Sequence, residues 1–146
     1  MLDCDLANAY FLLRRKQPYA GHFNGFGGKI ELGESVHEAM SRELEEETDL
    51  KRDDLQKLIH LMTIKYPSEI ELNVFYAILN KEVEPNYRID EEGTIRKCQI
   101  TDKMLAANNS CYAGDGNIAY FLNYALRLEG RDISTTMSDG MAGKEL

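Results

Sequence analysis

The sequence predicts one α/β domain built around a mixed β-sheet, and three observations lead to this class. Apolar stretches with the length of strands alternate with two substantial helical segments. The 146 residues suit one domain with a hydrophobic core, and 43% of them are hydrophobic. No internal repeat is present. We therefore expect a single domain over residues 1–130, followed at 131–146 by a mobile tail without apolar periodicity.

The expected strands are apolar runs of suitable length, bounded by charged residues or by turn formers. Pro67 and Ser68 separate two of these runs. A glycine-rich loop is expected at residues 17–28, and a polar loop around Pro85 at residues 82–92. The expected strands cover residues 6–14, 58–66, 70–79 and 94–100.

Helices are expected where the chain carries signals for their ends. Ser35 and Glu38 fit the S-x-x-E capping box, which places the start of a helix directly after Ser35. Near the end of the chain, Asn117 is expected to cap a second helix and Gly130 to stop it. The expected helical segments cover residues 36–48, 117–128 and, as a single turn, 101–107.

Composition and charge narrow the range of functions. The formal net charge of −8 argues against a sequence-independent grip on nucleic acid polymers, which requires a basic surface. No apolar run approaches the ~20 residues that span a membrane, and the N-terminus has acids where a signal peptide carries basic residues. The three scattered cysteines are typical of free thiols in a reducing compartment. We therefore expect a cytoplasmic protein that binds neither membranes nor nucleic acid polymers.

The helix expected at residues 36–48 carries four glutamates within five positions. At about 100° per residue, Glu43 and Glu47 fall among the apolar positions of the helix. Glu46 lies at their border, and only Glu45 points away. A solvated acidic face would place its acids opposite the apolar side. Carboxylates that face a packed surface repel one another and lose solvation, so the pattern predicts a site for a hard divalent ion such as Mg²⁺ or Mn²⁺.

A glycine-rich loop, Gly27-Gly28-Lys29, precedes this helix. It is not a Walker A loop, because Ile30 follows the lysine where Ser or Thr is needed. From Gly28 the chain reads G-x5-E-x7-R-E-L-x-E-E-x-D-L, which resembles the Nudix hydrolase signature Gx5Ex7REUxEExGU, with U a bulky aliphatic residue. Only the second glycine differs, and Asp49 takes its place. Because Asp tolerates the left-handed conformation expected at this helix end, we expect a small loss of stability and intact catalytic geometry.

The resemblance implies an α/β/α sandwich, with the mixed sheet between helices, that hydrolyses a diphosphate bond with metal-activated water. Mg²⁺ is the expected cofactor, and Mn²⁺ is also suitable. Glu46 and Glu47 would be the main metal ligands, and the carbonyl of Gly27 would complete the metal sphere. Glu43 would be a further ligand or the group that orients the water, two roles that the sequence does not separate.

The resemblance also implies a set of supporting residues. Arg42 would hold the helix carboxylates in place by ion pairing, and Glu34 would be a ligand or a carboxylate just outside the metal sphere. Relatives carry a loop glutamate near the metal and the water. Glu92 is preferred to Glu91 for this place because Gly93 follows it, and an exposed acidic loop is the alternative.

The NGFGGK segment at residues 24–29 is similar to the loop of the MutT-like 8-oxo-dGTP diphosphatases. In those enzymes the asparagine hydrogen-bonds the oxidised purine, which implies this role for Asn24, while a turn-forming Asn is the alternative. Lys29 would contact a phosphate or be a surface charge. Asp115, just before the last helix, would contact the base or only form a turn. The aromatic candidates for stacking on the base are Phe26 and Tyr112.

The expected partner is a small-molecule nucleotide, a nucleoside triphosphate that is cleaved to the monophosphate and pyrophosphate. Two alternatives stay open. A Nudix hydrolase could act on another diphosphate, such as ADP-ribose or a dinucleoside polyphosphate. A Nudix-fold module could instead sense a nucleotide without cleaving it, although such modules typically lose acids that are kept here at Glu43, Glu46 and Glu47. The sequence leaves the oligomeric state open.

Overall fold

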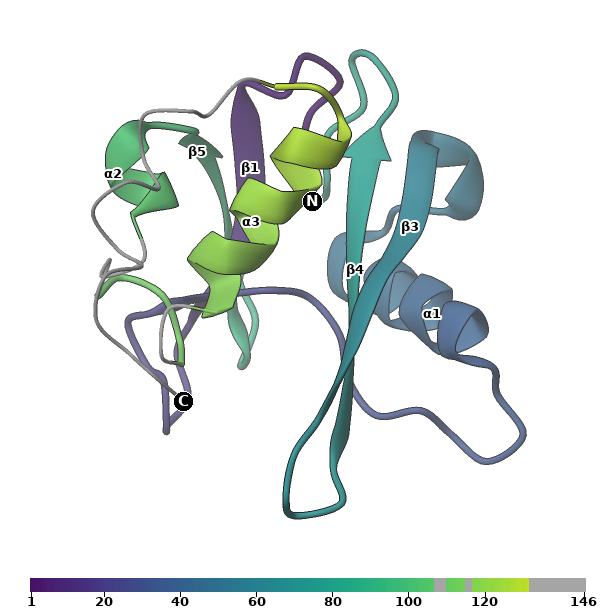
Figure 1. The fold of residues 1–146 in the computed structure, drawn as a ribbon. Coiled ribbons are helices and arrows are strands. Elements are labelled where there is room, and N and C mark those ends of the chain that lie inside the picture. Colours follow the sequence, from purple (N-terminus) through teal and green to yellow (C-terminus); the bar gives the residue numbers. More distant parts are fainter. Residues whose placement is uncertain (107–109, 115–116, 132–146) are drawn as a thin grey trace.

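The computed structural model describes residues 1–106, 110–114 and 117–131, and Figure 1 shows their arrangement. The order of strands and helices agrees with the order expected from the sequence, and the α/β class is confirmed. In chain order the elements are β1 (Asn8–Arg14), β2 (Phe23–Asn24), α1 (Val36–Thr48), the 3-10 helix η1 (Arg52–Asp54), β3 (Leu55–Lys65), β4 (Glu71–Leu79), β5 (Gly93–Gln99), α2 (Asp102–Leu105) and α3 (Asn117–Leu128).

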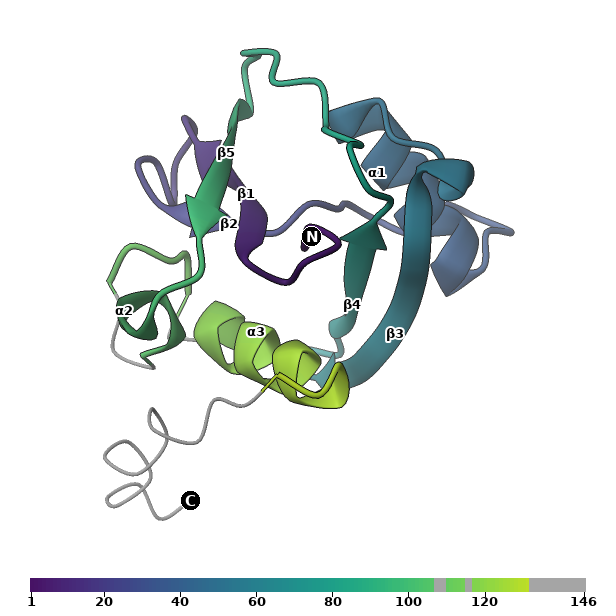
Figure 2. The ribbon, with the colours of Figure 1, turned by 90° about the horizontal axis from the view of Figure 1, so that it is seen from above.

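The strands form two antiparallel sheets, with the orders β2-β1-β5 and β3-β4. Leu2 joins the two sheets, because its N–H donates to the Ala77 carbonyl at 2.8 Å and its carbonyl accepts from the N–H of Leu79 at 2.9 Å. Figure 2 shows the N-terminus lying between β1 and β4. Leu2 pairs parallel with β4 and antiparallel with Ala9 of β1, so the strand directions are mixed.

Side chains of β1 and β4 alternate between two hydrophobic cores on opposite faces of the sheets, as the twofold period of a strand requires. Phe11 packs in one core with Leu122 of α3. Tyr10 and Leu79 pack in the other with Leu44 of α1. The two long helices therefore cover opposite sides of the strands (Figure 2), as in an α/β/α sandwich.

The N-terminal half differs from the expected element boundaries in two places. β1 begins at Asn8 rather than at residue 6, since Leu6 has a left-handed φ of 57°. Asp3 stabilises this turn by accepting hydrogen bonds from the N–H groups of Ala7 and Asn8 at 2.9 and 3.1 Å. The loop expected at residues 17–28 contains the short strand β2, whose two residues are too few to give a periodic signal.

The last described helix begins and ends close to the expected residues. Asn117 is the first residue of α3 rather than its cap, and Gly130, with a φ of 79°, follows the helix. Arg131 donates from its guanidinium to the Leu6 carbonyl at 2.6 Å. The tail expected after it lies outside the described residues and stays a prediction. Within the described ranges, no helix has the length and apolar character needed to cross a membrane, and the expected cytoplasmic location stays a prediction.

Candidate functional site

Both ends of α1 are fixed by local hydrogen bonds. The N–H of Glu38 donates to Ser35 Oγ at 3.2 Å, and the N–H of Ser35 donates to the Glu38 carboxylate at 2.7 Å, which confirms the expected capping box. At the other end Asp49 has a φ of 59°, and its N–H donates to the Glu45 carbonyl at 2.8 Å. The expected left-handed helix end is therefore confirmed as well. With Leu44 buried beneath it, the helix presents its acids in a defined orientation.

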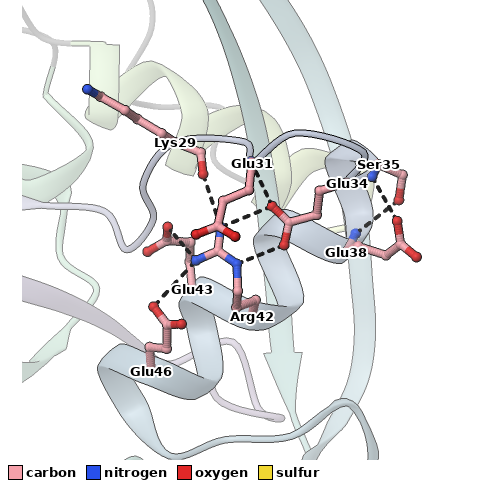
Figure 3. A network of polar contacts seen from close by, with 8 residues as sticks. All are labelled: Lys29, Glu31, Glu34, Ser35, Glu38, Arg42, Glu43 and Glu46. Carbon is pink, nitrogen blue, oxygen red and sulfur yellow. Dashed lines mark hydrogen bonds and ion pairs between the residues drawn. The ribbon is translucent and has the colours of Figure 1, made fainter.

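Arg42 is the centre of a carboxylate network on α1 and on the loop before it (Figure 3). Its Nε and Nη2 donate to the two carboxylate oxygens of Glu34 at 2.7 and 3.0 Å. Its Nη1 donates to Glu43 at 2.9 Å and to Glu46 at 3.4 Å, and its Nη2 also donates to the Lys29 carbonyl at 3.0 Å. The hydrogen bonds from Arg42 lower the pKa of the Glu34 carboxyl. One guanidinium thus offsets three carboxylates and ties the glycine-rich loop to the helix.

Glu47 lies on the more buried side of the acidic helix and accepts a hydrogen bond from the Gly27 N–H at 2.7 Å. Its pKa is raised to about 7, first because burial disfavours the charged carboxylate. The hydrogen bond from Gly27 lowers the pKa, while the negative charges of Glu43, Asp90 and Glu92 raise it further. A carboxyl group in this environment is favourable for binding a cation that compensates its charge.

A cavity of about 370 Å³ opens beside Glu47, and we call it the acidic cavity. All five residues expected to bind the metal line it, whereas Glu91 does not. The cavity wall therefore carries five carboxylates and a single guanidinium. The lining residues are Leu12, Gly27, Glu43, Glu46, Glu47, Arg88, Asp90, Glu92, Gly93 and Ile95.

Glu92 reaches the acidic cavity from the loop that precedes β5. Its backbone is fixed by Asp90, whose carboxylate accepts from the N–H groups of Glu92 and Gly93 at 2.9 and 3.1 Å. Its side chain lies 2.6 Å from Lys16 Nζ, and the same ammonium lies 3.4 Å from Glu91. The loop thus holds Glu92 at the cavity with part of its charge already compensated.

The donors of the acidic cavity fit a hard divalent cation, because such ions take carboxylate and carbonyl oxygens as ligands. Across the described ranges, no three Asp, Glu, His or Cys side chains are arranged as a ready-made metal-binding group. The reason is local: Arg42 draws Glu43 and Glu46 toward itself, and the Gly27 N–H holds Glu47. Metal binding here therefore requires at least one carboxylate to leave its present partner. Glu46 can turn most easily, because its side chain is 59% exposed.

A larger cavity of about 770 Å³ shares Gly27 and Glu43 with the acidic cavity. Asn24 and Lys29, both expected to bind substrate, also line it. The Lys29 side chain extends away from Arg42 and its carboxylates, although the Lys29 carbonyl faces them (Figure 3). The remaining wall is mostly apolar. Its aromatic residues are Phe11, Phe26, Phe75, Tyr76 and Phe121.

Of the two aromatic residues considered for stacking on a base, Phe26 lines the larger cavity but Tyr112 does not. Tyr112 is only 3% exposed, its ring packs edge-on against Phe11 with centroids 5.5 Å apart, and its hydroxyl donates to the Met104 carbonyl at 3.0 Å. It is a core residue, so the expectation that it stacks on a base is wrong. Asp115 lies outside the described residues, and its contact with a base stays a prediction.

The structure adds lining residues that sequence reasoning did not identify. Arg88 and Asp90 line the acidic cavity, and Phe75 and Phe121 line the larger one. A signal for Asp90 was present, because it stands directly before the acidic pair that was considered at the next positions. The other three carry no local signal, and only the fold brings them to the cavities.

Comparison with known proteins agrees with this geometry. The family model described as the NUDIX domain matches residues 3–109. A mouse protein named oxidized purine nucleoside triphosphate hydrolase is 38% identical over 60 residues, which cover 40% of this chain and 38% of the mouse protein. A Danio rerio protein of the same name is 42% identical over 69 residues, which cover 45% and 43% of the two chains. The chain thus matches less than half the length of these relatives.

A solved structure of similar fold is that of a C. elegans Ap4A hydrolase in a binary complex. The TM-score is 0.59, and the match covers 85% of this chain and 89% of that chain. Only 19% of the residues are identical, so this similarity supports the fold alone.

Proposed function

The chain belongs to the NUDIX domain family, and we propose that it is a Mg²⁺-dependent nucleotide pyrophosphohydrolase. The proposed substrate is a purine nucleoside triphosphate, with oxidised purines such as 8-oxo-dGTP as the preferred class. Water is added across the bond between the α- and β-phosphates. The products are a nucleoside monophosphate and pyrophosphate.

The observation that carries this proposal is the contact between the two cavities. The acidic cavity and the larger, mostly apolar cavity share Gly27 and Glu43. A nucleoside triphosphate has the same two parts, since its phosphates bind divalent cations and its base binds apolar and aromatic surfaces. The arrangement therefore supports a ligand that places its phosphates by α1 and its base among the aromatic side chains.

The residues of the acidic cavity divide the chemical work. Glu46, Glu47 and the Gly27 carbonyl would hold the ion. When bound, a divalent ion neutralises phosphate oxygens and lowers the pKa of attached water. Glu43 is a further ligand or orients the attacking water, and either Glu43 or Glu92 takes its proton. Both carboxylates line the cavity, which supports either assignment.

Arg42 is proposed to keep these carboxylates in position, and its contacts with Glu34 and Glu43 support this role. The bidentate geometry at Glu34 is one that a lysine could not reproduce. Without the guanidinium, the carboxylates would repel one another and lose their common orientation.

Substrate choice is proposed to rest on Asn24, assisted by Asp115. The side-chain amide of Asn24 offers a donor and an acceptor to a purine edge, and Asn24 lines the larger cavity beside Lys29. Lys29 is proposed to contact a phosphate. The two relatives named oxidized purine nucleoside triphosphate hydrolases support the purine assignment.

The test is a hydrolysis screen with Mg²⁺ over 8-oxo-dGTP, dGTP, dCTP, ADP-ribose and a dinucleoside polyphosphate, with the products separated. The expected result is a monophosphate and pyrophosphate, formed fastest from the oxidised purine and abolished by EDTA. A reaction in ¹⁸O-labelled water identifies the phosphorus that is attacked. The Glu47→Gln variant, purified in parallel, controls for contaminating phosphatases.

Each alternative gives a distinct result in this screen. ADP-ribose or the dinucleoside polyphosphate as the best substrate would replace the triphosphate proposal with another diphosphate substrate. Nucleotide binding without turnover of any compound would identify a sensing module.

A further inference from the structure

The residue that departs from the Nudix signature, Asp49, makes contacts that a glycine at this place could not make. Asn86 Nδ2 donates to one oxygen of its carboxylate at 2.5 Å, and Arg88 Nη1 lies 3.4 Å from the other. Asn86 is also fixed through its backbone, since its N–H donates to the Thr48 carbonyl at 2.9 Å. The end of α1 is therefore joined to the loop of residues 86–92 by side chains as well as by backbone.

Arg88 carries this connection onward into the acidic cavity. Its guanidinium contacts the carbonyl of Glu46 at the end of α1. Its Nε lies 3.8 Å from the carboxylate of Asp90, and Arg88 itself lines the cavity. A single arginine thus lies between Asp49 on the helix and Asp90 on the loop.

Asp90 completes the path to Glu92. One oxygen of its carboxylate is near Arg88, and the other accepts from the N–H groups of Glu92 and Gly93 at 2.9 and 3.1 Å. The orientation of Asp90 therefore fixes the backbone from which the Glu92 side chain enters the cavity.

We propose that Asp49 is a positioning residue that acts through Arg88 and Asp90 to hold Glu92 at the acidic cavity. It replaces a glycine whose only contribution would be the left-handed helix end. The consequence for the reaction rests on the proposed function, whereas the consequence for the order of the loop does not.

The contacts are of a kind that orders a loop without adding much to overall stability. The side chains of Asp49, Arg88 and Asp90 are 52%, 40% and 46% exposed, and ion pairs at such exposure contribute little to the free energy of unfolding. Misplacement of a catalytic group by about 1 Å, in contrast, can slow a reaction by about 100-fold. The effect of Asp49 is therefore expected in loop protection and turnover rather than in the melting temperature.

The test compares Asp49→Gly, Asp49→Asn and Arg88→Gln with the wild type. Amide hydrogen exchange is measured over residues 86–92, together with kcat and KM for the best nucleotide. The matched control is Glu45→Gln, which removes a carboxylate from the same end of α1 but only an exposed contact with Lys51 at 3.9 Å.

Asp49→Gly is expected to keep the melting temperature while it speeds exchange over residues 86–92 by about 10-fold. It should lower kcat by at least about 5-fold, with a smaller change in KM. Asp49→Asn should recover most of the exchange protection, because its amide oxygen still accepts from Asn86 and Arg88. Glu45→Gln should match the wild type in both measurements.

A double-mutant cycle separates this role from simple loosening of the helix end by glycine. Asp49→Gly combined with Arg88→Gln should speed exchange no more than either change alone, because both remove the same connection. Wild-type exchange and kcat in Asp49→Gly, or additive effects in the double variant, would overturn the proposal. Failure of the proposed function gives a different result, since the wild type would then hydrolyse no nucleotide while Asp49→Gly still loosened the loop.

Discussion

The carboxylate of Glu43 occupies the space that a side chain at Gly28 would need. A β-carbon at Gly28 would lie 2.2 Å from Oε1 of Glu43, 2.5 Å from its carboxyl carbon and 2.7 Å from Oε2. The carboxylate is held in this place by Arg42 at 2.9 Å. The first glycine of the motif is therefore required by a side chain of the site, and the backbone dihedrals of Gly28 do not impose it.

We predict that Gly28→Ala displaces the Glu43 carboxylate and lowers kcat by about 10- to 100-fold. The melting temperature should change little, because the end of a glutamate side chain can move at small cost. Steady-state kinetics and thermal melts of the variant test this expectation. Gly25→Ala, where an added β-carbon meets no atom within 4 Å, is the steric control for the melts. Wild-type kcat in Gly28→Ala would show that the position of Glu43 does not matter.

Glu46→Gln and Glu47→Gln are each expected to lower kcat by at least ~100-fold while the fold stays intact. Each change removes a ligand charge from the wall of the acidic cavity. The comparison to make is with Glu45→Gln on the same helix, which should keep nearly full activity. Circular dichroism establishes that each variant is folded. Near-normal turnover in either cavity variant would contradict the metal assignment.

Mg²⁺ should stabilise the wild-type protein against heat, because it relieves repulsion among carboxylates that the folded state gathers. At a concentration 100-fold above its Kd, a ligand that binds only the folded state contributes about 2.7 kcal/mol. For a domain of this size that is a rise in Tm of roughly 5–10 °C. Melting curves recorded from EDTA to millimolar Mg²⁺ give the measurement, and the rise should shrink in Glu47→Gln. A melting curve that does not respond to Mg²⁺ would count against the site.

Without metal, the pH dependence of stability should reveal Glu47. Its pKa is raised from the ordinary value of 4.5 to about 7 in the folded protein. Between these values the folded state holds a proton that the unfolded state has lost, so stability falls as the pH rises from about 4.5 to about 7 and then levels off. The Tm of the wild type minus that of Glu47→Gln, measured in EDTA, should therefore decrease over this range. A difference that stays constant with pH would show that Glu47 titrates normally.

The acidic helix could be predicted from the sequence because its signals are local. The capping box of Ser35 and Glu38 and the left-handed end at Asp49 involve residues within one helical turn, and the structure contains both. The inward direction of Glu43 and Glu47 follows from helical periodicity in the same way. Secondary structure with such signals is determined before any long-range packing is considered.

Features that depend on contacts between distant segments could not be predicted. Arg88 reaches the acidic cavity because the loop before β5 packs on the end of α1, a contact between residues 42 positions apart. Tyr112 is buried because its ring meets Phe11 from the first strand, and no local pattern distinguishes it from an exposed aromatic residue. The junction of the two sheets at Leu2 likewise exists only when β1 and β4 are both in place.

The choice of base gives the last prediction, and it concerns Asn24. A buried site that hydrogen-bonds a base penalises substrates that leave its polar groups unpaired. If the Asn24 amide contacts a purine edge in the larger cavity, Asn24→Ala should reduce the kcat/KM ratio of 8-oxo-dGTP to dCTP by at least ~10-fold. Its rate on the poorer substrate should change much less. Glu46 and Glu47 are assigned to the phosphates alone, so their glutamine variants should lose activity on every triphosphate in equal proportion.

The measurement for Asn24 is kcat/KM for 8-oxo-dGTP, dGTP and dCTP with the wild type, Asn24→Ala and Glu46→Gln. Two separate ratios follow from these values, one for the base and one for the phosphate chemistry. A drop of the same size on all three substrates in Asn24→Ala would mean that this residue supports the loop next to Gly27 rather than the base. Equal wild-type rates on the three triphosphates would overturn the purine assignment and leave the hydrolase proposal intact, because the carboxylates of the acidic cavity do not contact the base.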